Sequence, residues 1–186
     1  MVHITGDENG AGIPSSPDKS PLLLVHGLNT DGLIWFERND PFKTALPMQL
    51  FDAGYDVYIA NLRGTEGSRG HDTLDPDDLD DLVNGAAAYW DFDASDSGKL
   101  DIPAMIKAIQ ADRDIDGADC LKVQLVAYSR GAVSSLLTPA LYPDTAQGVI
   151  GSVQAIAPCF VADTAAVLGT LEPAEGPPDD RRMLST

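Results

Sequence analysis

The chain has 186 residues, of which 12 are Lys or Arg and 29 are Asp or Glu, giving a formal net charge of −17. That length fits one domain, and a hydrophobic fraction of 44% is enough for a core, which excludes a disordered polyelectrolyte. A chain this negative repels phosphates and has no basic stripe, so nucleic acid is disfavoured as a partner. The longest apolar runs are far too short for a transmembrane segment.

Three regions follow one another along the chain. Residues 1–20 form a polar N-terminal segment, where no basic stretch with an apolar region marks a secretory signal, so export has no support there. Residues 21–160 are expected to form a partial α/β core, and residues 161–186, without periodicity and with several prolines, to form a tail or the start of a linker or cap. Cys120 and Cys159 lie far apart without a CxxC pattern, so we expect two buried small hydrophobes rather than a disulfide or zinc site.

Strand-like and helix-like segments alternate between residues 21 and 160, which is typical of an α/β fold with a mostly parallel sheet flanked by helices. Short apolar runs predict four adjacent parallel strands at Leu22–His26, Asp56–Ala60, Leu121–Ala127 and Val149–Ala157. Helices are predicted at Phe42–Ala53, closing on Gly54, from Asp101 onwards with Pro103 in the first turn, and after Arg130 towards Leu141. Nothing in the pattern sets an oligomeric state.

The strongest local signal is Ala-Tyr-Ser-Arg-Gly at residues 127–131, between a predicted strand and a predicted helix. It resembles the nucleophile elbow of α/β-hydrolases, G-x-S-x-G, with Ala127 in the first small position. Small residues are needed because strand and helix almost touch at this sharp turn. The turn would lift the Ser129 hydroxyl out of the sheet and place the Arg130 backbone N–H where a tetrahedral oxyanion forms.

A second signal is His26-Gly27-Leu28, directly after the first apolar strand. It resembles the loop that supplies the other oxyanion donor in lipases and esterases, which would make the Leu28 backbone N–H that donor. Gly27 would permit the close turn. His26 is expected to be structural, because backbone groups do the chemistry of this motif.

Longer stretches in the same order resemble the acid lipase family, the gastric and lysosomal lipases with their lipase-associated N-terminal region, of which this chain matches the N-terminal part. Together these stretches cover about residues 21–158 of the chain. They are residues 21–28 with Trp35, 50–58, 61–64, 68–71, 89–92, 101–106 and the elbow. The resemblance implies a serine-dependent carboxylic ester hydrolase acting on lipid esters, without a cofactor or metal. It implies Ser129 as the nucleophile with Leu28 and Arg130 as backbone oxyanion donors. If the N-terminus is incomplete, the resemblance would also suggest a secreted or lysosomal protein.

The chain departs from that family in two ways. The family elbow reads G-H-S-Q-G, so Ala127, Tyr128 and Arg130 all differ, and Arg130 brings a cation to the mouth of the site. The family's triad Asp and His follow the serine, whereas the three histidines here, at positions 3, 26 and 71, all precede Ser129. We therefore expect a lipase-like chain without its triad acid and base, and with little activity by itself. The alternative is a degenerate, non-catalytic α/β-hydrolase that binds lipid or a protein partner.

Other acidic and basic residues offer weaker candidates. His71 lies at the sheet edge expected for Ser129, but a role in ordering its own loop is favoured over a role as base. Asp163 could imitate a triad acid, yet no histidine is left for it to orient. The six aspartates between residues 72 and 81, and a calcium-loop start at Asp112, are interpreted as a solvated loop and a helix-to-strand turn, not metal sites.

Overall fold

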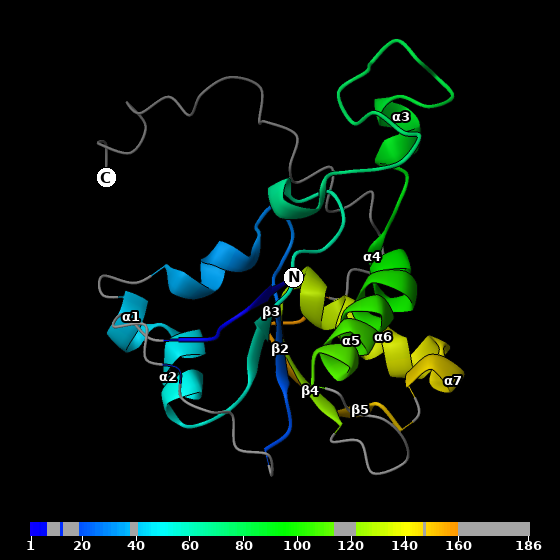
Figure 1. The fold of residues 1–186 in the computed structure, drawn as a ribbon. Coiled ribbons are helices and arrows are strands. Elements are labelled where there is room, and N and C mark those ends of the chain that lie inside the picture. Colours follow the sequence, from blue (N-terminus) through cyan, green and yellow to red (C-terminus); the bar gives the residue numbers. More distant parts are fainter. Residues whose placement is uncertain (7–11, 13–18, 38–40, 114–121, 147, 160–186) are drawn as a thin grey trace, which may run out of the picture.

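A five-stranded sheet forms the centre of the molecule (Figure 1). The computed structural model describes residues 1–6, 12, 19–37, 41–113, 122–146 and 148–159. The strands lie in the order β1-β3-β2-β4-β5 and are β1 (Val2–His3), β2 (Leu22–Val25), β3 (Val57–Ile59), β4 (Val123–Tyr128) and β5 (Ile150–Ile156). The pairs β3·β2, β2·β4 and β4·β5 are parallel, which confirms the four predicted strands and their adjacency.

The sequence pattern does not predict strand β1, because two residues cannot carry an alternating pattern. It pairs antiparallel with β3, so part of the polar N-terminal segment joins the sheet. The His3 ring stacks on Tyr58 at 4.2 Å between centroids, and its Nε2 lies 2.7 Å from the buried Asp56 carboxylate. These contacts hold the first residues of the chain against β3, with Val2 opposite Ile59.

Helices cover both faces of the sheet, as Figure 1 shows, with α1 and α2 on one side and α5 and α6 on the other. Strand residues alternate between two cores, since Leu23 and Val25 pack with α5 and α6 whereas Leu24 packs with α2. On α5, the buried side chains of Ile102, Ile106 and Ile109 recur at helical spacing. Burying each such side chain contributes about 1.5–3 kcal/mol.

The helix predicted for residues 42–53 is broken into α1 (Pro41–Thr44) and α2 (Leu46–Asp52). Ala45 between them is extended, at φ −69° and ψ 138°. The cause is Pro47, whose ring would clash with the carbonyl four residues earlier in a continuous helix but fits the first turn of a new one. Gly54 ends α2 as predicted, with φ +82°.

The helix predicted to begin at Asp101 begins earlier. The chain is already helical in α4 (Ala94–Asp96), passes through a π-helical turn, η3 (Ser97–Asp101), and continues into α5 (Ile102–Asp112). Asp93 caps α4, and Asp101 makes no cap hydrogen bond because the backbone around it is already helical. The remaining helices are η1 (Gly32–Phe36), η2 (Glu66–Ser68), α3 (Ala86–Tyr89), α6 (Arg130–Leu141) and α7 (Pro143–Ala146).

Cys159 was predicted to be buried, and this is wrong: its side chain is exposed. It lies beyond the end of β5, at the outer edge of the sheet, where the described neighbours on the chain are exposed as well. Cys120, Asp163 and the tail predicted for residues 161–186 lie outside the described residues.

Candidate active site at the end of strand β4

Ser129 occupies the turn between β4 and α6, at the carboxyl edge of the parallel strands as predicted. Its backbone has φ 53° and ψ −121°, which is rare for a residue with a Cβ and costs on the order of 1–3 kcal/mol. Hydrogen bonds on both sides hold this conformation. The Ser129 N–H donates to the Ile156 carbonyl at 2.9 Å, and its own carbonyl accepts from Ala132 at 3.0 Å and Val133 at 3.2 Å. The strained turn therefore joins β4, β5 and α6 at one residue.

The small residues around the turn are required by close backbone contacts. A Cβ on Gly131 would lie 2.1 Å from the His26 carbonyl oxygen, so α6 can approach β2 only with glycine there. A Cβ on Gly27 would lie 3.1 Å from the Ser129 Cβ. The loop after β2 is thus packed directly against the serine.

His26 is structural, in agreement with the sequence analysis. It is buried, and its Nε2 accepts the Leu62 backbone N–H at 3.0 Å. Nδ1 therefore carries the proton and donates to the Gly27 carbonyl at 2.8 Å. Burial lowers the pKa of His26, more than its bond to the Gly27 carbonyl raises it, so the neutral ring is favoured. The ring ties the loop after β2 to the loop after β3.

The predicted oxyanion donors lie on either side of this contact. Leu28 follows Gly27, and Arg130 is the first residue of α6, where backbone N–H groups have no intrahelical acceptor. Within the described part of the chain, neither amide donates a hydrogen bond. Both are therefore available to a bound oxygen, and their convergence on one point stays a prediction.

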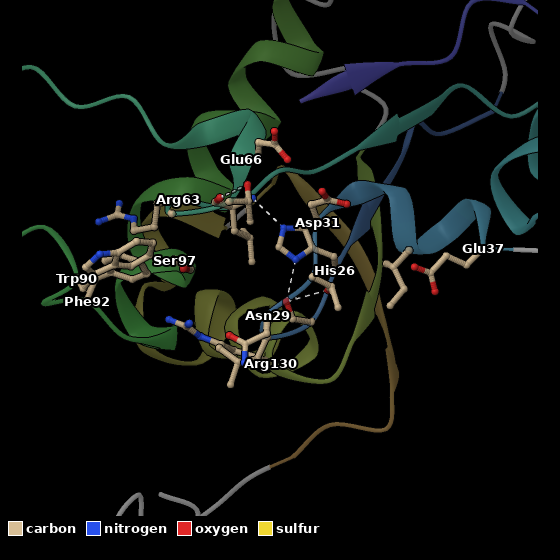
Figure 2. Close-up of a pocket in the computed structure, with 17 residues that line it drawn as sticks. His26, Asn29, Asp31, Glu37, Arg63, Glu66, Trp90, Phe92, Ser97 and Arg130 are labelled. Atoms are coloured by element: carbon tan, nitrogen blue, oxygen red, sulfur yellow. Dashed lines mark hydrogen bonds between the residues drawn. The ribbon is translucent and has the colours of Figure 1, made fainter. Parts of the chain in front are cut away.

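A cavity of about 580 Å³ opens beside this loop and is lined by both Leu28 and Arg130 (Figure 2). Much of its wall comes from residues 26–31 after β2, residues 62–66 after β3, and the aromatic pair Trp90 and Phe92. Ile34, Glu37, Ser97 and Arg130 complete the lining. In Figure 2, Arg130 lies towards the aromatic side, whereas Asp31 and Glu66 lie on the opposite side of His26. The cavity therefore has a basic and aromatic end and an acidic end.

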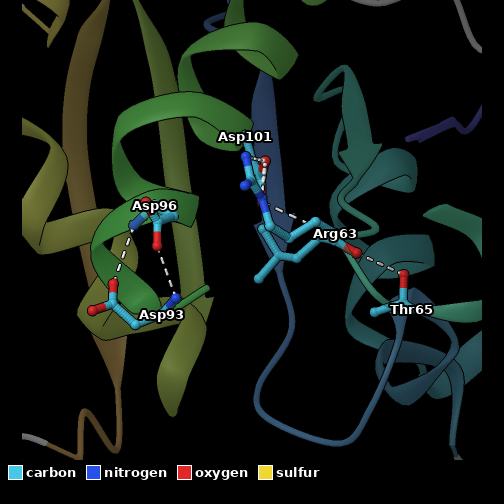
Figure 3. A network of polar contacts seen from close by, with 6 residues as sticks. Arg63, Thr65, Asp93, Asp96 and Asp101 are labelled. Carbon is cyan, nitrogen blue, oxygen red and sulfur yellow. Dashed lines mark hydrogen bonds and ion pairs between the residues drawn. The ribbon is translucent and has the colours of Figure 1, made fainter. Parts of the chain in front are cut away.

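Arg63 is a site residue to which the sequence analysis gave no role. Its guanidinium donates to Asp101, with Nη2–Oδ1 at 2.7 Å and Nε–Oδ1 at 2.9 Å (Figure 3). The hydrogen bonds to this carboxylate raise the pKa of Arg63. The partners are 38 residues apart, so no local sequence pattern links them. The one sequence signal is that both lie in stretches that resemble the acid lipases.

His71 orders its own loop, as favoured above. Its Nδ1 accepts backbone N–H groups from Thr73 at 3.2 Å and Leu74 at 3.0 Å, and it does not line the cavity beside Leu28. Asp75, Asp78 and Asp81 make the same kind of local bond, for example Asp78 to the N–H groups of Asp80 and Asp81. Across the described residues, no three His, Cys, Asp or Glu side chains are grouped to hold a metal ion.

Comparison with known proteins agrees with this geometry. The model of the alpha/beta hydrolase family matches residues 22–185. The chain belongs to this family. The α/β-hydrolase is 27% identical to triacylglycerol lipase 2 of Arabidopsis thaliana over 91% of its length, and 34% identical to lipase 1 of Drosophila melanogaster over 76%. It is also 32% identical to lipase member M of Mus musculus over 69%.

The α/β-hydrolase covers only part of these lipases: 40%, 29% and 27% of their respective lengths. The fold and the resemblance to lipases predicted from the sequence are confirmed by these matches. In the described part of this α/β-hydrolase, no helix has the length and apolar character needed to cross a membrane.

Proposed function

We propose that Ser129 is the nucleophile of a carboxylic ester hydrolase acting on lipid esters. The observation that carries the proposal is the strained Ser129 turn, packed against the Gly27–Leu28 loop at the carboxyl edge of the sheet. The names of the similar proteins, triacylglycerol lipase and lipase, support the substrate class.

The reaction is acyl transfer in two halves. The Ser129 oxygen attacks the ester carbonyl carbon, a base takes the hydroxyl proton, and the carbonyl oxygen gains negative charge. The Leu28 and Arg130 amides donate to that oxygen; in enzymes, loss of one such donor costs about 10²–10³ in turnover. The C–O bond then breaks, the alcohol leaves with the proton, and water releases the acid from the acyl-serine by the reverse sequence.

We propose that the acid and the base are supplied by residues other than these 186. Each histidine of the chain has another task. His3 lies between the carboxylates of Asp56 and Asp112, on the edge strand β1, and His26 and His71 accept backbone N–H groups. A serine without an imidazole to take its proton is a weak nucleophile at neutral pH.

Hydrolysis of 4-nitrophenyl butyrate tests the proposal in two proteins. The 186-residue chain is expected to give no more than trace turnover, and the chain carried beyond Thr186 in the same reading frame to give turnover that Ser129→Ala abolishes. Robust turnover by the 186 residues, lost in both Ser129→Ala and His71→Ala, would identify His71 as the base and contradict the proposal. A longer protein that binds lipid but hydrolyses no ester would favour the non-catalytic alternative.

A further inference from the structure

The Arg130 side chain is the unusual feature of this site. It follows the proposed nucleophile directly, it is half-buried, and it lines the cavity beside Leu28 (Figure 2). Its Cζ lies 5.6 Å from the centre of the Phe92 ring, a cation–π contact. Among the described residues, no side chain or carbonyl forms a hydrogen bond or an ion pair with its guanidinium.

The carboxylates of Asp93, Asp96 and Asp101 act on the charge of Arg130, and all three are bound to other groups, as Figure 3 shows. Asp101 holds both Nε and Nη2 of Arg63. Asp93 accepts the N–H groups of Ser95 and Asp96 at the start of α4, and Asp96 accepts the Asp93 N–H at 2.9 Å. These three carboxylates lower the electrostatic cost of the charge on Arg130 without occupying its N–H donors.

Burial nevertheless lowers the pKa of Arg130, more than the carboxylate of Asp93 raises it. The guanidinium nevertheless stays charged at neutral pH, because the ordinary pKa of arginine lies far above 7. A partly desolvated guanidinium with free donors binds an anionic oxygen group strongly and often through two bonds. Arg63 cannot take this role, since its own fork already holds Asp101.

We propose that Arg130 binds a carboxylate or phosphate group of the substrate, so that the site prefers esters carrying a negative charge near the scissile carbonyl. This inference rests on the proposed function and names the substrate class for the same site. The apolar chain attached to that group would lie on Phe92 and Trp90, which form the neighbouring wall of the cavity. The acidic end, with Asp31 and Glu66, would repel the charged group and so fix its orientation.

Equilibrium binding tests this without requiring hydrolysis. The 186-residue chain is titrated with octanoate, octyl phosphate and 1-octanol, which share one alkyl chain, and binding is followed by calorimetry. Octanoate or octyl phosphate is expected to bind about 10- to 100-fold more tightly than 1-octanol, as charge-assisted hydrogen bonds would give. The ligand with the larger advantage identifies the carboxylate or the phosphate as the preferred group.

Arg130→Gln is the decisive variant, because glutamine keeps the backbone N–H and is the residue of the acid lipase pattern. It should remove the advantage of the charged ligand and leave 1-octanol binding unchanged. Lys107→Gln is the matched control, since it removes one positive charge from an exposed position on α5 that does not line the cavity. Charged ligands that bind no better than 1-octanol, or that bind Arg130→Gln and Lys107→Gln equally well, would overturn the inference, whatever the result of the hydrolysis test.

Discussion

The close approach of α6 to β2 makes Gly131→Ala the sharpest structural test of the turn that presents Ser129. The added Cβ would lie 2.1 Å from the His26 carbonyl oxygen and 2.9 Å from both Cγ1 and the carbonyl oxygen of Val25. An ordinary van der Waals contact is more than about 1 Å longer than the distance to the His26 carbonyl oxygen. That oxygen belongs to the backbone, so it cannot move aside as a flexible side chain can. Overpacking of this kind costs about 1–3 kcal/mol or more.

Because the obstructing atom is backbone, we expect the upper part of that range, about 2–3 kcal/mol. Alanine also favours the helical state over glycine by up to about 1 kcal/mol, so the net loss expected for Gly131→Ala is about 1–2 kcal/mol. With a slope of about 2 kcal/mol per molar urea, the midpoint of unfolding should fall by about 0.5–1 M. Far-ultraviolet circular dichroism in urea measures this. Gly70→Ala is the control, because a Cβ there meets no atom within 4 Å. If Gly131→Ala unfolds at the same or a higher urea concentration than the unaltered chain, the close contact described here is wrong.

Two further predictions concern the groups that hold the site loops. Because burial lowers the pKa of His26, its ring should titrate with a midpoint below 6.5 in proton NMR. The free energy of unfolding should fall as the pH drops from 6.5 through that midpoint, since the unfolded chain binds the proton first. A midpoint at or above 6.5 would contradict the assigned hydrogen bonds. Asp101→Asn breaks the half-buried pair with Arg63 and should cost about 1–3 kcal/mol in urea unfolding. Asp77→Asn breaks the exposed pair with Arg69 and should cost less than about 1 kcal/mol. Equal losses would show that the Arg63 pair is no better shielded from water.

Some parts of the fold were predictable because their causes are local. The four parallel strands are short apolar runs, since both their faces are buried, and the turn at Ser129 needs small residues on both sides. Strand β1 was missed because its stability comes from contacts of His3 with Tyr58 and Asp56, more than fifty residues away. No local pattern carries such contacts.

The site shows the same division. The structural role of His26 followed from the Gly27–Leu28 loop, but its partner Leu62 did not, because the loop after β3 meets it only in the folded chain. The sequence alone predicts Arg130 as a cation at the mouth of the site. In the described part of the chain its guanidinium has no hydrogen-bond or ion-pair partner, because Asp101 pairs with Arg63 instead. Only the tertiary structure makes this choice among partners.

The central claim is that position 129 faces amide donors able to stabilise an oxyanion, and Ser129→Cys tests it most directly. A thiolate needs no base, so the variant can be acetylated by 4-nitrophenyl acetate without a triad. Peptide mass spectrometry gives the acetylation rates of the introduced thiol and of the exposed Cys159 in the same molecule, each taken at the pH-independent plateau. Acetylation at position 129 is predicted to be at least about tenfold faster than at Cys159. An equal or slower rate at position 129 would contradict the oxyanion site.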